Sequence, residues 1–262
     1  MGFGSRPEKK GVHVTQERRE GQTVSVEDAD FEAFYRGERP LAGPSVDFGG
    51  CVPWDIGEPQ PALVELERNG LIRGEVLDAG CGTGDNTLFL TERGYPVTGF
   101  DGAPTALELA RRRAQDRGLD PDFVEADATR LEGFEQRFDT ILDSALYHCL
   151  GDGQRREYSA ALHRVANPGA HLHLFCFSDA EPEKSLFPVS QDDLRTNLGA
   201  HWDIGSITPT NYTSSFTREI AGRMFSQPAF QDTAMPFDPD SADTDEQGRI
   251  LLPVWYLHAV RR

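Results

Sequence analysis

The fold of this chain is decided by Val76-Leu77-Asp78-Ala79-Gly80-Cys81-Gly82-Thr83-Gly84-Asp85-Asn86-Thr87. A short apolar run ends in an acid, three glycines then alternate with small residues, and the run Leu88-Phe89-Leu90 begins a helix-forming segment. This order predicts a strand, a tight turn and a helix. Glycines in such a turn permit positive φ and let a ligand lie against bare main chain.

The glycine spacing and three later strands narrow the fold class. The spacing is G-x-G-x-G instead of the G-x-G-x-x-G of dinucleotide-binding folds, and no Lys-Ser or Lys-Thr of a phosphate loop follows it. Three further predicted strands also end in acids, at residues 97–101, 123–127 and 138–143. Open α/β sheets bind ligands at the carboxyl ends of their strands. The sequence therefore predicts a doubly wound α/β fold with one ligand-binding edge.

From about Asp55 to Cys176 the chain resembles the class I methyltransferases that use S-adenosyl-L-methionine (SAM). The resemblance implies a Rossmann-like, mostly parallel sheet of seven strands, and it implies SAM as the cofactor. The stretch Ile250–Val260 looks like the antiparallel last strand of that fold.

Three segments resemble bacterial heterocyclic-toxin and thiopurine-type small-molecule methyltransferases more closely: 53–61, 138–148 and 254–261. This resemblance implies methyl transfer to an oxygen or nitrogen of a small aromatic or heteroaromatic acceptor, such as a natural product, toxin or xenobiotic. Two alternatives stay open. The chain could methylate a thiol, halide or metalloid, which needs no base, or it could bind SAM without catalysis.

The family pattern also implies cofactor contacts, residue by residue. Asp78 would face the methionine end of SAM, Asp101 would bind the ribose hydroxyls, and Asp127 would read the adenine amine. Any one of these acids alone could equally be a helix-capping carboxylate. The full predicted set is Trp54, Asp78, Gly80, Gly82, Asp101, Gly102, Asp127, Ala128 and Asp143.

The predicted catalytic residues follow the fourth strand, in Asp143-Ser144-Ala145-Leu146-Tyr147-His148. His148 has a side chain that can accept a proton from a hydroxyl or ring nitrogen near neutral pH. Alternatively, His148 could only form part of the pocket wall beside the sulfonium of SAM. Tyr147 is its companion, as a wall residue or an acid.

The predicted organisation has three parts. Residues 1–24 are polar and form a disordered tail. Residues 25–60 form a lid, in which an S-x-x-D start at Ser25 leads into a helix with Phe31, Phe34 and Tyr35 on one face. Residues 61–262 form the methyltransferase domain, with an insertion at 211–247.

The insertion carries aromatic residues at irregular spacing, and they allow two interpretations. They either wall the acceptor pocket or pack the insertion onto the sheet. The predicted substrate-binding residues are Tyr35, Phe225 and Phe230; Phe216, Met224, Met235 and Phe237 belong to the same group.

Composition restricts the partners. The chain of 262 residues has a formal net charge of −17, so we expect no nucleic-acid substrate. The basic run Arg111-Arg112-Arg113 is predicted to be a solvated helix face. No signal peptide and no long apolar span are present, so we expect a soluble, cytoplasmic monomer or homodimer that does not contact membranes.

The cysteines and histidines complete the expectations. The four cysteines show no C-x-x-C pairing and are expected to be reduced thiols. His171 and His173 share one strand face, but the sequence offers them no third ligand. Such a pair is more often structural than metal-binding, so no metal site is predicted.

Overall fold

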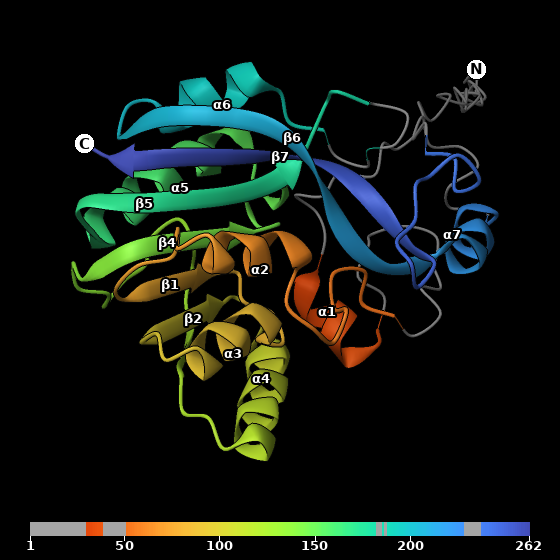
Figure 1. The fold of residues 1–262 in the computed structure, drawn as a ribbon, viewed down its shortest axis with the longest axis horizontal. Helices are drawn as coiled ribbons and strands as arrows, with labels where there is room; N and C mark the ends of the chain where they lie inside the picture. Colours follow the sequence, from red (N-terminus) through yellow and green to blue (C-terminus); the bar gives the residue numbers. More distant parts are fainter. Residues whose placement is uncertain (1–29, 39–50, 182–184, 186–187, 228–236) are drawn as a thin grey trace, which may run out of the picture.

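A computed structural model describes residues 30–38, 51–181, 185, 188–227 and 237–262, and the predicted tail lies outside these ranges. Seven strands form one sheet in the order β3-β2-β1-β4-β5-β7-β6 (Figure 1). The first five strands are parallel, β7 runs antiparallel to β5, and β6 runs antiparallel to β7. The predicted fold class is confirmed. The strands are β1 (Val76–Ala79), β2 (Val97–Asp101), β3 (Asp122–Glu125), β4 (Phe138–Ser144), β5 (Ala166–Phe177), β6 (Trp202–Thr217) and β7 (Arg249–Arg261).

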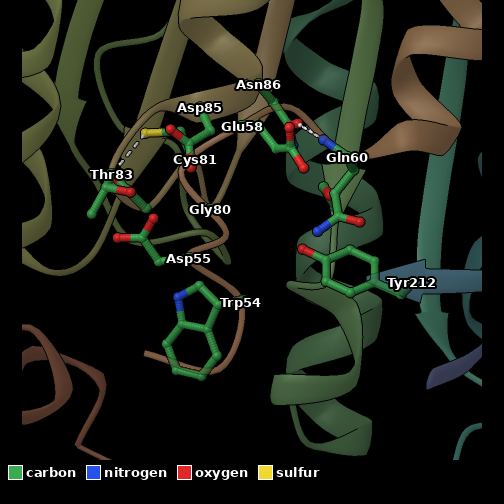
Figure 2. Close-up of a pocket in the computed structure, with 12 residues that line it drawn as sticks. Trp54, Asp55, Glu58, Gln60, Gly80, Cys81, Thr83, Asp85, Asn86 and Tyr212 are labelled. Atoms are coloured by element: carbon green, nitrogen blue, oxygen red, sulfur yellow. Dashed lines mark hydrogen bonds between the residues drawn. The ribbon is translucent and has the colours of Figure 1, made fainter. Parts of the chain in front are cut away.

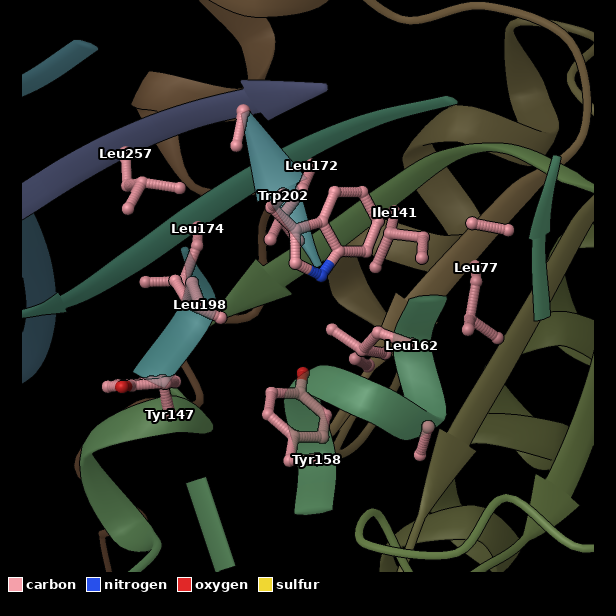
Figure 3. Close-up of a cluster of buried hydrophobic side chains, with 14 of the residues drawn as sticks. Leu77, Ile141, Tyr147, Tyr158, Leu162, Leu172, Leu174, Leu198, Trp202 and Leu257 are labelled. Carbon is pink, nitrogen blue, oxygen red and sulfur yellow. The ribbon is translucent and has the colours of Figure 1, made fainter. Parts of the chain in front are cut away.

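Helices cover both faces of the sheet and bury two hydrophobic cores. Helices α5 and α6 pack with Leu77, Ile141 and Trp202 on one face (Figure 3). The other face packs against α2, α7 and the outer halves of β6 and β7. The helices are α1 (Phe31–Arg36), α2 (Pro61–Arg68), α3 (Asp85–Glu92), α4 (Pro104–Arg117), α5 (Asp152–Val165), α6 (Gln191–Leu198) and α7 (Arg218–Phe225). A 3₁₀ turn, η2, spans Tyr147–Cys149.

Strand β6 extends into the predicted insertion. It begins at Trp202 and continues to Thr217. Pro209 argues against a strand in sequence, yet β6 is the edge of the sheet, where a missing N–H costs no ladder bond. The extended halves of β6 and β7 form an arm that leads to α7 (Figure 1).

The structure shows how several residues of the predicted insertion are packed. Phe216, Met224 and Phe237 are buried in the core cluster on the α2 face. Sheet packing therefore accounts for these three. Phe225 is half-buried beside them, with its ring centroid 4.9 Å from that of Phe237. Phe230 and Met235 lie outside the described residues.

Three smaller findings concern the start of α1, the cysteines and membrane-spanning helices. The cap of α1 is Asp30, whose carboxylate accepts from the Ala33 N–H at 3.0 Å, so the helix starts later than the predicted Ser25 start. None of the four cysteines, all of which are described, forms a disulfide. No helix within the described ranges is long and apolar enough to cross a bilayer.

The glycine turn has the predicted backbone. Gly80, Gly82 and Gly84 have φ of 67°, 54° and 86°, a region that favours glycine. At Gly84 an added Cβ would lie 2.9 Å from the Phe123 ring and 3.1 Å from Ala110. The turn therefore needs glycine there for its dihedral angle and for close packing of α3 against its neighbours.

We predict that Gly84→Ala destabilises the protein more than Gly94→Ala. Both glycines have φ near +87° (86° and 87°), but an added Cβ at Gly94 meets nothing within 4 Å. The left-handed conformation costs both variants about 1–2 kcal/mol. Crowding against Phe123 should add ~1–3 kcal/mol at Gly84 only. Urea unfolding measures the difference, and equal losses would contradict this packing role.

Candidate cofactor and acceptor site

A pocket lies where the glycine turn follows β1, and it contains about 370 Å³ of empty space including its open mouth. In Figure 2 the rings of Trp54 and Tyr212 lie below the glycine turn, while Glu58 and Asn86 lie above it. The pocket therefore joins parts of the chain that are far apart in sequence. Its lining residues are Trp54, Asp55, Glu58, Gln60, Gly80, Cys81, Gly82, Thr83, Asp85, Asn86, Ser144 and Tyr212.

Asp101, at the end of β2, contacts the glycine turn directly. One carboxylate oxygen accepts from the Gly82 N–H at 2.8 Å and the other from the Ala103 N–H at 2.8 Å. Burial raises the pKa of Asp101, while these two N–H groups oppose the rise. Each oxygen keeps a second lone pair, so the acid can hold both turns and still accept a ligand hydroxyl. Gly102 beside it is exposed.

Asp78, at the end of β1, is buried, and its two carboxylate oxygens differ in their hydrogen bonds. Its Oδ2 accepts from the Thr87 hydroxyl at 2.6 Å, whereas Oδ1 has no hydrogen-bond partner among the described residues. Burial raises its pKa to about 6. A buried carboxylate oxygen without a donor is costly, so this site favours a cationic or donating ligand.

Asp127 and Ala128 lie beyond β3 and do not line the pocket. Asp127 is exposed, and its Oδ1 accepts from the Thr129 hydroxyl at 2.6 Å and from the Thr129 N–H at 2.8 Å. The Thr129 hydroxyl chiefly lowers the pKa of Asp127. Ala128 packs against the core on the α5 face. The predicted adenine contact of these two residues stays a prediction.

Trp54 and Tyr35 stand together at the pocket. The Trp54 Nε1–H donates to the Tyr35 hydroxyl at 2.6 Å, and the Phe31 and Phe34 rings of α1 pack around Trp54 at 5.7 and 5.0 Å. The Tyr35 hydroxyl would lie 2.8 Å from a Cβ at Gly82. Helix α1 therefore lies directly against the glycine turn.

Arg113 corrects the prediction of a solvated basic run. Its guanidinium pairs with both carboxylate oxygens of Asp55, the nearest at 2.9 Å, and with Asp85 at 2.9 Å. It also donates to the Thr83 hydroxyl at 2.7 Å. Arg113 directly follows two other arginines in the sequence, and nothing nearby in the sequence reveals its distant acid partners. Arg113 ties the loop before α2 to the glycine turn.

Gln60 is a pocket residue that the sequence analysis missed. Its side-chain amide donates to the Thr213 carbonyl at 2.9 Å and accepts from the Thr213 N–H at 3.1 Å, as a neighbouring strand would. Its own N–H donates to the Asn86 side chain at 3.0 Å. Gln60 thereby fixes the β6 arm, with Tyr212, against the glycine turn. A glutamine in a proline-rich loop carries no sequence signal for this role.

Asp143 holds the turn after β4, which carries the predicted catalytic residues. Asp143 is fully buried, and its carboxylate accepts from the Leu146 N–H at 2.8 Å and the Tyr158 hydroxyl at 2.9 Å. Burial raises its pKa to about 7. Asp143 does not line the pocket. These contacts give it a structural role in holding the turn.

Tyr147 and His148 point to different surroundings. The Tyr147 hydroxyl donates to Asp193 at 2.9 Å within the core on the α5 face. The His148 ring stacks on Phe177 with centroids 4.1 Å apart, and its Nδ1 is buried without a hydrogen-bond partner among the described residues. Burial, assisted by Arg155, lowers the His148 pKa to about 3. His148 is therefore a neutral imidazole at neutral pH, with one unsatisfied nitrogen.

Comparison with known proteins identifies the family. The methyltransferase-domain family matches residues 76–169, from β1 into β5. A 2-heptyl-1-hydroxyquinolin-4(1H)-one methyltransferase of Mycobacteroides abscessus is 38% identical over 191 residues, covering 71% of this chain and 82% of the relative. The chain is a SAM-dependent methyltransferase. The glycine turn of this methyltransferase and the unsatisfied Oδ1 of Asp78 fit its cationic cofactor, SAM.

More distant relatives of the methyltransferase are named for other substrates. A demethylmenaquinone methyltransferase of Thermus thermophilus is 38% identical over 144 residues, 54% of this chain and 61% of the relative. A probable thiol methyltransferase of Arabidopsis thaliana is 28% identical over 156 residues, 53% of this chain and 69% of the relative.

A solved structure aligns over nearly the whole methyltransferase. It is described as "Conversion of a Disulfide Bond into a Thioacetal Group during Echinomycin Biosynthesis". The TM-score is 0.69 at 35% identity, and the alignment covers 88% of this chain and 91% of the other. The similarity therefore extends beyond the β1–β5 half into β6 and β7.

We predict that Asp101→Ala weakens SAM binding by about ten- to hundredfold. A hydrogen bond to a charged group contributes ~1.5–3 kcal/mol, and the variant also releases the Gly82 N–H. Asp116→Ala, an exposed acid on α4, is the matched control. Calorimetry measures both affinities. Unchanged SAM affinity in Asp101→Ala would contradict the assignment of Asp101 to the ribose hydroxyls of SAM.

We also predict that SAM affinity falls below pH 6. The pKa of Asp78 is raised to about 6, so the acid is ionised at pH 7.5 and mostly protonated at pH 5. A cationic ligand prefers the ionised form, so affinity should drop about tenfold per pH unit below the pKa. Calorimetry between pH 5 and 8 tests this. Asp78→Asn should bind more weakly, with a flatter pH profile; an identical slope would assign the titration to another group.

Proposed function

We propose that this methyltransferase methylates an oxygen or nitrogen of a small aromatic or heteroaromatic acceptor. The observation that carries the proposal is the buried Nδ1 of His148, which has no hydrogen-bond partner among the described residues; His148 does not itself line the pocket but follows the lining residue Ser144 in the turn after β4. Phe177, itself buried, stacks on the imidazole and fixes its orientation. The hydroxyquinolone-methylating relative at 38% identity supports the same acceptor class.

The chemistry requires positioning and removal of one proton. SAM supplies the methyl group, which moves to the acceptor by in-line displacement. His148, kept neutral by burial, accepts a hydrogen bond from the acceptor's O–H or N–H and takes its proton as the methyl transfers. Burial opposes the imidazolium form, so the proton would pass on to solvent or product.

The surrounding residues keep His148 in place. Asp143 orders the turn through the Leu146 N–H, and the Tyr147 hydroxyl is engaged by Asp193. Tyr147 therefore serves as a wall and an anchor of η2 in this proposal. Trp54 and Tyr212 give the pocket apolar walls, as small-molecule sites usually have.

Helix α1 is proposed to be the moving part of a lid. Glu32 accepts from the Thr105 N–H at 3.0 Å in the first turn of α4, next to Asp101. Tyr35 and Trp54 stand over the glycine turn. Opening these few contacts would admit SAM, and closing them would exclude water during transfer.

Sulfur is the second candidate acceptor, because the probable thiol methyltransferase and the disulfide-to-thioacetal structure both act on sulfur. A thiolate needs no base, so it would leave His148 without a proton to accept. The panel below separates the two acceptor classes.

The test is turnover with SAM and a panel of 4-hydroxyquinolones, N-heterocycles, aryl thiols and iodide, followed as S-adenosylhomocysteine. We expect a hydroxylated or N-heterocyclic acceptor to react fastest. His148→Gln should lower its kcat by about a hundredfold or more, with SAM affinity unchanged. His163→Gln, a partly exposed histidine of α5, is the control. Fastest turnover of a thiol, insensitive to His148→Gln, would establish the sulfur alternative instead.

A further inference from the structure

A cluster of three histidines lies on the sheet face that packs against α2. His171 and His173 come from β5, and His258 comes from β7, directly opposite His173 in the strand register. The ring centroid of His258 is 5.1 Å from that of His171 and 5.2 Å from that of His173. The sequence predicted no metal because it offered no third ligand. Strand pairing supplies that ligand from near the end of the chain.

The ligand atoms converge. One ring nitrogen from each histidine lies within 4.8 Å of the other two, and among the described residues this is the only group of three or more potential metal ligands that meets this distance. His173 is buried, while His171 and His258 are half-buried. The cluster is thus reachable from solvent on one side and backed by the sheet on the other. None of the three lines the SAM pocket.

Hydrogen bonds orient the buried histidine as a ligand. His173 Nε2 lies 3.3 Å from the Leu71 carbonyl, which can only accept, so this nitrogen carries the proton. Nδ1 therefore has the lone pair and lies 2.8 Å from the Tyr256 hydroxyl. A backbone carbonyl on the remote nitrogen is the usual outer-shell support of a metal-binding histidine.

The other two histidines form a hydrogen bond whose place a metal would take. His171 Nδ1 and His258 Nε2 lie 2.9 Å apart, so one donates to the other. Burial lowers the pKa of all three imidazoles, that of His173 to about 3, and keeps them in the neutral form that metals require. Arg73 is the opposing charge, 3.5 Å from His171 Nε2, but its exposed side chain can turn into solvent.

We propose that His171, His173 and His258 bind a divalent transition-metal ion, foremost Zn²⁺, with the Tyr256 hydroxyl or water in the fourth position. Three imidazoles without a carboxylate or thiolate favour Zn²⁺, Ni²⁺ or Cu²⁺ over Mg²⁺ or Ca²⁺. The ion would join β5 to β7 and, through the Leu71 carbonyl, to the segment before β1. Its binding would move the proton between His171 and His258 to the outer nitrogen of the ring that carries it, with no net proton release, and would displace Arg73.

The test uses the full chain after removal of metals with a chelator. Titration with ZnCl₂ should show one site and a rise in Tm that MgCl₂ does not produce. CoCl₂ should give the visible absorption bands of nitrogen-coordinated Co²⁺. Arg73→Gln, which leaves all three ligands in place, should bind Zn²⁺ more tightly than the unchanged chain.

The matched comparison is His258→Asn against His163→Asn. His163 and His201 form a histidine pair without a third member, with ring centroids 5.1 Å apart. His258→Asn should weaken Zn²⁺ binding at least tenfold, and His163→Asn should leave it unchanged. The proposal is overturned by equal Zn²⁺ affinity in His258→Asn, by loss in His163→Asn, or by absence of Co²⁺ bands. If His258→Asn does not fold, weaker or equal binding by Arg73→Gln overturns it independently.

Discussion

The carboxylate of Asp101 holds together the two turns from which the ligand edge is built. It accepts from Gly82 after β1 and from Ala103 before α4, so neither turn can move without breaking a charge-assisted bond. The positive φ of Gly82 aims its N–H at this acid. The Tyr35 hydroxyl, which accepts from Trp54, lies close against Gly82, so the position of both rings depends on this contact.

Charge at this edge is arranged for a cationic ligand. Asp78 is fully buried and its pKa is raised to about 6, and burial raises the pKa of Asp101 as well. Concentrating buried acids costs folding free energy when nothing offsets them. A ligand with a sulfonium and an ammonium group relieves that cost. Binding energy for SAM is thus partly stored in the folded protein before SAM arrives.

The sequence predicted what is encoded locally. The glycine turn, the end of β2 and the positions of Asp78 and Asp101 follow from short patterns and lie where those patterns predict them. The third strand does not, because it ends at Glu125, two residues before the acid Asp127 that was predicted to end it. Contacts between distant segments were missed because one partner carries no signal of the other. Arg113 looked like its exposed neighbours, Gln60 looked like loop, and the histidine pair lacked His258 until β7 paired with β5.

The amide pairing of Gln60 with Thr213 has a consequence for how the molecule assembles. The two residues are 153 positions apart, and Ser215 likewise bonds the Pro53 carbonyl. The ribosome synthesises the glycine turn long before the β6 arm, so the nascent chain would carry only part of the pocket lining. Contacts of such separation form late because loop closure must precede them. The pocket lining would therefore be complete only once the last strands have docked.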